Sequence, residues 1–355
     1  MTKDGSFKKV VRRHAQETDQ RYTEALSDLE GIESRLFHQP DADRVAAHLR
    51  DRYGVEGASA TKVSQHNDHV FRVDRRDGDP WIARVFPPAR TRAAVDGDAA
   101  ILRFLEGQGY PAERLAVDDA VSELDGASVL VTRFIDGGPL PEGREKIAMM
   151  GDLLGRLHAL APDATVSRPG GAGGDDPSRA GSPQQDLIAA LSFLDAVDTK
   201  VTAAGRERFD QLRDQVRSAD DGNGLPEALL HGNLLHSPDH ALLTDQGPVA
   251  YNWKSAGVGP RLADLAFLLW GASNVEGDGI GAAVEAYGRH VELTDDELDR
   301  LEPVMEVRPL YLVCFDFRRS VASGHQPDGS EWWWNFIDRG YLQAAADRTR
   351  AAVRP

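Results

Sequence analysis

The side chains that could carry chemistry are concentrated in one segment, residues 230–266. Its candidate catalytic residues are His231, Asn233, His236 and Asp239. Histidine titrates near neutrality, which makes His236 a candidate proton carrier. Asp239 offers the anionic oxygen that magnesium prefers. The amide of Asn233 is barely basic and cannot accept a proton, so the segment combines acid–base and metal-binding groups with a side chain that can only form hydrogen bonds.

The order of short motifs in this segment is specific. It reads Leu230-His231-Gly232-Asn233, then Val249-Ala250-Tyr251-Asn252-Trp253, then Gly259-Pro260-Arg261-Leu262-Ala263-Asp264-Leu265-Ala266. This order resembles the catalytic core of the aminoglycoside phosphotransferase and choline kinase family. The resemblance covers roughly residues 55–345. It implies an α+β, bilobal protein-kinase-like fold with ATP in the cleft between the lobes.

The resemblance also implies roles for residues on either side of the cleft. Arg84 stands where the family places a lysine that contacts phosphate, and Asp98 stands where the next helix normally offers a glutamate. We expect Arg84 and Asp98 to face each other, since pairing offsets the desolvation of both charges. His231 and Asp264 match the family residues that brace the catalytic loop by hydrogen bonds.

Two carboxylates of the family pattern are replaced by amides. Phosphoryl transfer needs a metal, a cation on the phosphates and a carboxylate that orients the acceptor hydroxyl. The resemblance implies that Asn233 stands where the family has the Asp that orients the hydroxyl. It likewise implies that Asn252 stands where the family has the Asp that binds the metal. The expected metal-binding Asn falls at Pro238 unless Asp239 replaces it, and the loop over the phosphates, 65–69, has no glycine. We therefore expect no metal site, and no ATP or magnesium unless the chain is an active kinase.

Charge and composition exclude several classes of partner. The chain of 355 residues has 41 Lys and Arg against 57 Asp and Glu, a net charge of -16, which disfavours nucleic acid and anionic membranes. The single cysteine, Cys314, excludes an intramolecular disulfide. No apolar stretch approaches the ~18 residues of a membrane span, and no signal-peptide pattern follows Met1. These features predict a cytoplasmic protein.

Periodicity along the chain predicts the elements that hold these residues. Strands are expected at 70–73, 81–86 and 128–134, and helices at 41–53, 99–105, 147–160, 186–197 and 204–216. The pattern changes from strands to helices after a hinge near Asp136. We divide the chain into an N-terminal helical extension (1–54), a small lobe with a nucleotide-side β-sheet and one helix (55–137), and a larger helical lobe (138–355).

Two functions of different classes stay open. The first is a pseudokinase-type protein, repurposed to bind or modify a peptide or small molecule in the interlobe cleft. The resemblance allows such a role in natural-product biosynthesis, with lyase or cyclase chemistry on a modified peptide or with a protein partner. The second is an active ATP-dependent phosphotransferase acting on a small alcohol or an aminoglycoside-like compound. A third interpretation is an inactive kinase made by engineered Asp→Asn changes at Asn233 and Asn252.

Overall fold

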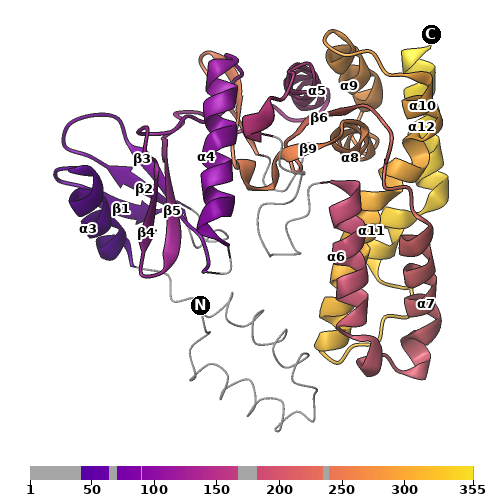
Figure 1. Ribbon diagram of the computed structural model, residues 1–355. Helices are drawn as coiled ribbons and strands as arrows, with labels where there is room; N and C mark the ends of the chain where they lie inside the picture. The colour runs from indigo at the N-terminus through magenta and orange to yellow at the C-terminus, as the bar shows by residue number, and fades with distance from the viewer. Residues whose placement is uncertain (1–40, 64–69, 89, 167–181, 235–239, 355) are drawn as a thin grey trace.

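The computed structural model describes residues 41–63, 70–88, 90–166, 182–234 and 240–354. In Figure 1 a β-sheet on the left is joined to a larger group of helices on the right. The helices are α3 (Ala42–Tyr53), α4 (Arg92–Gly107), α5 (Arg144–His158), α6 (Pro183–Asp195), α7 (Ala203–Ser218), α8 (Leu262–Ala272), α9 (Gly279–Gly288), α10 (Asp295–Asp299), α11 (Leu301–Ala322) and α12 (Arg339–Val353). The strands are β1 (Ser59–Lys62), β2 (Val70–Asp74), β3 (Trp81–Val85), β4 (Val121–Leu124), β5 (Ala127–Arg133), β6 (Glu227–Leu230), β7 (Ala241–Thr244), β8 (Gly247–Ala250) and β9 (Gly257–Pro260). Short 3-10 helices are η1 (Ala164–Val166), η3 (Asp198–Lys200), η4 (Trp253–Ser255) and η5 (Trp332–Ile337).

The small lobe is one antiparallel sheet with the strand order β1-β2-β3-β5-β4. The prediction that three separate strand segments share a sheet is confirmed. Helix α4 packs on this sheet through a buried stripe that includes Val95, Leu102 and Leu105. Burying such a stripe supplies most of a helix's stability in water. Helix α4 stands between the sheet and the large lobe (Figure 1), so it can carry contacts to both.

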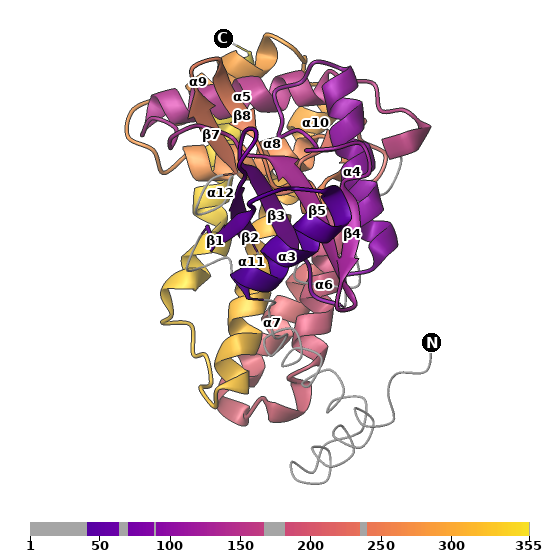
Figure 2. The same cartoon turned by 90° about the vertical axis from the view of Figure 1, so that its left-hand side faces the viewer.

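Helix α3 packs on the small lobe. Asp41 caps its first turn by accepting a hydrogen bond from the Arg44 backbone, and Val45 and Leu49 are fully buried. The His48 ring lies 2.9 Å from the Ser122 hydroxyl in β4. Figure 2 shows α3 in front of the sheet. The helix that the sequence analysis placed in an N-terminal extension thus packs with the small lobe, and residues 1–40 lie outside the described part of the chain.

The large lobe has two hydrophobic cores. One is continuous with the small lobe and includes α5, α8 and α9, and the other is formed by α6, α7, α11 and η5. Helices α5 and α9 approach so closely that a Cβ at Gly151 would lie 2.8 Å from the carbonyl oxygen of Ala283. Glycine is required at this crossing. No described helix is long and apolar enough to cross a membrane.

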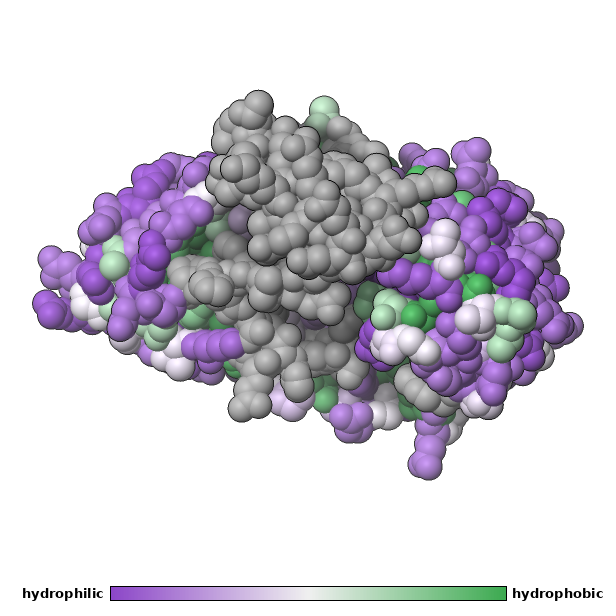
Figure 3. Space-filling view, turned by 90° about the horizontal axis from the view of Figure 1, so that it is seen from below, coloured by the Kyte–Doolittle hydropathy of each residue, from purple (hydrophilic) through white to green (hydrophobic). Residues whose placement is uncertain are grey.

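Two large apolar side chains are exposed on the helices that form the second core. Ile188 on α6 is 55% exposed and Phe315 on α11 is 36% exposed. Figure 3 shows green hydrophobic areas on the right-hand part of the molecule, while the visible left-hand part, which holds the small lobe, is mostly hydrophilic. Isolated apolar residues at the surface are normal in proteins, so we assign no function to these two.

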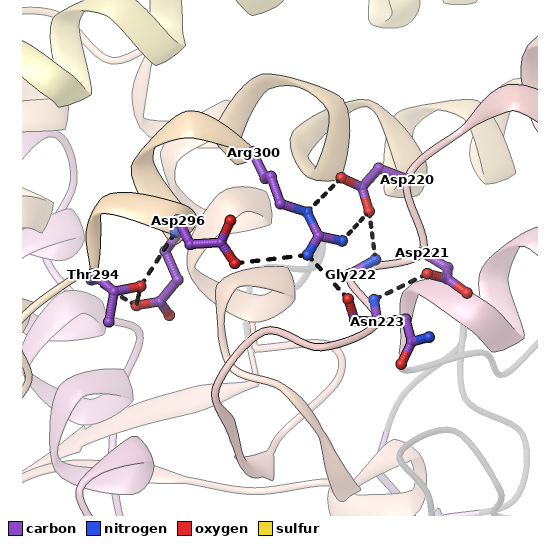
Figure 4. A network of polar contacts seen from close by, with 8 residues as sticks. Asp220, Asp221, Gly222, Asn223, Thr294, Asp296 and Arg300 are labelled. Carbon is purple, nitrogen blue, oxygen red and sulfur yellow. Dashed lines mark hydrogen bonds and ion pairs between the residues drawn. The ribbon is translucent and has the colours of Figure 1, made fainter.

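The segment with the candidate site is held by an ion pair, Asp220–Arg300, and by two short antiparallel pairs of strands. Strand β6 pairs with β9, and β7 pairs with β8. Just before β6, Asp220 accepts hydrogen bonds from Nε and Nη2 of Arg300 at 2.9 and 2.6 Å, and the carbonyl of Asn223 accepts one from Nη1 (Figure 4). Bidentate contacts of this kind fix orientation as well as distance. These contacts attach the loop before β6 to the beginning of α11.

Candidate active site

The loop that follows β6 is braced by a carboxylate from α8. Oδ2 of Asp264 accepts a hydrogen bond from the backbone N–H of His231 at 2.7 Å, and Oδ1 accepts one from Gly232 at 3.1 Å. Burial would raise the pKa of Asp264, but the neighbouring rings of His158 and His231 and the Gly232 hydrogen bond outweigh burial and hold that pKa below its ordinary value. Asp264 is therefore ionised. The predicted bracing role of His231 and Asp264 is confirmed.

The His231 ring links two backbone segments by hydrogen bonds. Its Nε2 donates to the carbonyl oxygen of Tyr251 at 3.0 Å, and its Nδ1 accepts from the backbone N–H of Asn233 at 3.3 Å. Burial lowers the pKa of His231, so the ring is neutral, as this pair of contacts requires. His231 is a positioning residue that joins the β6 loop to the segment after β8.

The lowered pKa of His231 predicts acid sensitivity. Below a pH of about 6.5 the unfolded chain takes up a proton at this ring while the folded chain does not, so the unfolded state binds more protons and acid favours it. We expect the free energy of unfolding to fall as the pH drops below about 6.5. His231→Asn should make this fall shallower by up to about 1.4 kcal/mol per pH unit. Urea titrations at several pH values measure both slopes, and equal slopes in two folded proteins would contradict the prediction.

The predicted pairing of Arg84 with Asp98 is wrong. Nη1 of Arg84 lies 2.6 Å from Oε2 of Glu113, while Asp98 pairs with Nη2 of Arg90 at 2.6 Å. Both side chains of the second pair are 2% exposed. Aspartate is one methylene shorter than glutamate, and Arg90, just before α4, lies within its reach. Arg90 also donates to the carbonyl of Lys254 at 3.1 Å, so this pair attaches α4 to η4.

Glu113 joins the small lobe to the segment after β8. Its carboxylate is 3% exposed, and while Oε2 contacts Arg84, Oε1 accepts a hydrogen bond from the backbone N–H of Asn252 at 2.7 Å. Asn252 has a φ of +68°, a left-handed conformation that asparagine tolerates better than most residues. Glu113 lies between α4 and β4, where no periodic pattern singled it out, so the sequence analysis missed it.

The side-chain amide of Asn252 is engaged by a histidine. Nδ1 of His240 lies 2.8 Å from the carbonyl oxygen of Asn233, so this nitrogen carries the proton and donates it. The other ring nitrogen, Nε2, therefore carries a lone pair, which accepts a hydrogen bond from Nδ2 of Asn252 at 3.0 Å. The two amide positions of the sequence motif are thus connected through one imidazole ring.

The Asn233 side chain contacts a buried ion pair that the sequence analysis did not predict. Its Oδ1 accepts a hydrogen bond from Nη2 of Arg308 at 3.3 Å, and Nη1 of Arg308 lies 2.6 Å from Oδ1 of Asp186. Burial raises the pKa of Asp186 to about 6, although Arg308 opposes the shift. Asp186 is on α6 and Arg308 is on α11. A charged residue on the buried side of each helix was the only signal in the sequence, and it does not identify a partner.

A small pocket lies beside this ion pair. Its volume is about 20 Å³, enough for one water molecule, and its lining includes Gly232, Asp264 and Phe267. The pocket is too small for an organic ligand. It places a solvent-sized space next to the carboxylate of Asp186.

The described residues do not fit a magnesium ion. Magnesium prefers anionic oxygens in octahedral geometry. Asn233 and Asn252 offer only neutral oxygens, and Nδ2 of Asn252 is directed at His240. Within the described ranges, no three His, Cys, Asp or Glu side chains converge as a metal site would require. The predicted site residues His236 and Asp239 lie outside the described residues, as does the 65–69 loop.

Comparison with known families supports the resemblance seen in the motifs. The model of the phosphotransferase enzyme family matches residues 59–304. Comparison with curated proteins gives no match.

Solved structures show the same fold. Amicoumacin kinase hAmiN, in complex with AMP-PNP, Ca²⁺ and Ami, is 14% identical with a TM-score of 0.61, covering 89% of this chain and 96% of its own. Spectinomycin phosphotransferase, in complex with ADP and spectinomycin, is 14% identical with a TM-score of 0.54, covering 87% and 99%. Choline kinase LicA from Streptococcus pneumoniae is 10% identical with a TM-score of 0.54, covering 87% and 98%. The predicted bilobal kinase-like fold is confirmed.

Proposed function

Because the chain belongs to the phosphotransferase enzyme family, we propose that it is a member without magnesium-dependent phosphoryl transfer, which binds a small molecule or peptide in its interlobe cleft. The observation that carries this proposal is that both amides at the carboxylate positions already have hydrogen-bond partners. Asn233 accepts from Arg308, and Asn252 donates to His240. These contacts use the amides as structural links.

The direction of each hydrogen bond supports the proposal. A residue that takes a proton from an acceptor hydroxyl must offer a basic atom, such as a carboxylate oxygen or an imidazole nitrogen. Oδ1 of Asn233 is not basic, and the group that contacts it is a guanidinium, which stays protonated. At Asn252, the atom that contacts His240 is an N–H donor, which cannot ligate a cation.

The contacts of Arg84 in the small lobe also support the proposal. In phosphoryl transfer a cation must interact with the phosphate groups of the nucleotide. The cation at this position, Arg84, is compensated by Glu113, whose other oxygen holds the backbone of Asn252. A triphosphate would have to compete with a carboxylate that also fixes the segment after β8. We therefore expect weak nucleotide binding.

Calorimetric titration with ATP, with and without magnesium, tests this proposal. We expect no tight, metal-dependent binding and no transfer of phosphate to an acceptor. Arg84→Gln serves as the comparison, because it removes the cation while Glu113 can still accept from Asn252. Tight binding that requires magnesium and is lost in this variant would contradict the proposal.

The second candidate is an active phosphotransferase acting on a small hydroxylated compound. It is favoured by the fold shared with kinases of amicoumacin and spectinomycin. It requires Asp239 to supply the metal ligand and another group, such as His236, to take the proton. An ATP turnover of ~1 per second or faster would establish this alternative, and loss of that turnover in Asp239→Asn would assign the ligand. The lyase or cyclase chemistry stays a prediction from the resemblance.

A further inference from the structure

A second cavity lies at the end of the small-lobe sheet where β5 leads into the hinge near Asp136. Its volume is about 650 Å³, within the usual range for small-molecule sites. Three arginines line it, namely Arg72 from β2, Arg75 from the β2–β3 turn and Arg133 from the end of β5. Neither Arg84 nor Glu113 lines it. Such a gathering of cations is unexpected on a chain with a net charge of -16.

Two of these guanidinium groups are held against aromatic rings. Cζ of Arg72 lies 4.5 Å from the ring centre of Phe134, and Cζ of Arg75 lies 4.5 Å from that of Trp81. Stacking on an aromatic face limits the freedom of the side chain and leaves the N–H groups at the edge of the guanidinium available for hydrogen bonds. The rings thus present these cations in a defined orientation.

Arg75 forms a hydrogen bond within the β2–β3 turn. Nε of Arg75 donates to the carbonyl oxygen of Asp79 at 2.8 Å, which bends the side chain back over its own turn. Gly78 has a φ of +125°, and a Cβ there would lie 2.2 Å from Nη2 of Arg75. The positive φ favours glycine at this position, and a larger residue would displace the guanidinium of Arg75.

The cations of the cavity are incompletely neutralised. Trp81 lies opposite Arg133 in the β3–β5 register, so both side chains are on the same face of the sheet. Nε of Arg72 pairs with Asp74 at 2.9 Å, but in the described part of the chain no carboxylate pairs with Arg75 or Arg133. Arg133 even contributes to a lowered pKa of Arg114, after the larger effect of burial. A bound anion would relieve this repulsion.

The other polar groups of the cavity narrow the class of anion. Asp79 and Asp136 also line it, and both are exposed. A carboxylate repels a bare anion but accepts hydrogen bonds from hydroxyl groups. A ligand that fits both sets of groups carries a compact anion at one end and hydroxyls at the other.

We propose that this cavity, beside the hinge near Asp136, binds a hydroxylated phosphate ester, such as a sugar phosphate. Arg75 and Arg133 donate to the phosphate oxygens, which guanidinium groups match in geometry. Asp79 and Asp136 accept from the hydroxyls. Arg72, already paired with Asp74, adds long-range attraction.

Calorimetric titration of the full chain with glucose 6-phosphate, without magnesium and at low salt, tests the proposal. Low salt is needed because exposed charges are screened. We expect saturable binding, about tenfold weaker in Arg75→Gln or Arg133→Gln and undetectable when both are changed. Inorganic phosphate should bind more weakly than glucose 6-phosphate, and glucose should not bind.

Arg76→Gln is the matched control. Arg76 is the next residue of the same turn, pairs with Glu56 at 3.6 Å and does not line the cavity, so this variant should bind as the unchanged chain does. Circular dichroism checks that every variant is folded. The proposal is overturned if glucose 6-phosphate does not bind at millimolar concentration, if Arg76→Gln weakens binding as much as Arg75→Gln, or if succinate binds as tightly as the phosphate ester.

Discussion

Changing Asn233→Asp and Asn252→Asp together is expected to raise magnesium-dependent ATP turnover by about 100-fold or more over the unchanged chain. The two changes restore different functions. A carboxylate at 252 supplies the anionic oxygen that a hard dication prefers, so Asn252→Asp alone should strengthen the binding of magnesium with ATP. A carboxylate at 233 orients and deprotonates a hydroxyl, so Asn233→Asp should matter only once metal and nucleotide are bound. Phosphate release and calorimetry measure the two effects.

Arg308 sets a limit on this gain. It already donates to Oδ1 of Asn233, so an aspartate there would form an ion pair with it and become less basic. Adding Arg308→Gln to the two substitutions should therefore raise turnover by about a further tenfold. The buried Asp186 can lose its cation because its pKa is raised to about 6 even with Arg308 beside it, so removing Arg308 should raise that pKa further and favour the neutral, protonated carboxyl.

Asn335→Asp is the control for the added negative charge. Asn335 is exposed on η5, outside the motifs of the candidate site, and its substitution should change neither metal binding nor turnover. If the two substitutions in the cleft together give no more turnover than either alone, the assignment of separate roles to Asn233 and Asn252 is wrong.

Arg261→Gln is expected to lower the free energy of unfolding by about 3–5 kcal/mol. Arg261 precedes α8, the helix that carries Asp264, and its Nε and Nη2 contact the two oxygens of Glu297 at 2.7 Å each. Glu297 is 0% exposed. Removing the arginine would leave a buried carboxylate without its cation, which is a costly state in a protein interior. Urea unfolding measures the loss.

The matched control is Arg289→Gln, which removes another arginine at the end of a neighbouring helix. Arg289 is 59% exposed and lies 3.8 Å from Asp152, so its loss should change the free energy of unfolding by less than about 1 kcal/mol. Similar losses in the two variants would show that the buried pair does not hold α8. Arg261→Met combined with Glu297→Leu should recover part of the stability, since no charge then stays buried.

Local patterns in the sequence account for much of the fold. The strands at 70–74, 81–85 and 127–133 and helices α4 and α5 follow from hydrophobic periodicity and turn residues, which depend only on near neighbours. The bracing of the loop after β6 was also predictable, because the spacing between His231 and Asp264 belongs to a motif. The family membership rests on the same motifs.

The absence of two carboxylates of the family pattern was likewise evident from the sequence alone. Asn233 and Asn252 stand at motif positions, and an amide differs from a carboxylate in charge and basicity wherever it lies. The hypothesis that these positions do not serve metal binding and proton transfer therefore follows from the sequence alone. What the two amides do in place of that chemistry could not be predicted.

Only the tertiary structure decided which charges pair. Arg84 pairs with Glu113, not Asp98, and Asn233 contacts Arg308, whose other partner Asp186 is 122 residues away in the chain. Periodicity shows which side of a helix is buried, but it does not show which buried group lies opposite. Charges in a low-dielectric interior pair with whatever opposite charge the packing brings within reach, so long-range packing determines the partners.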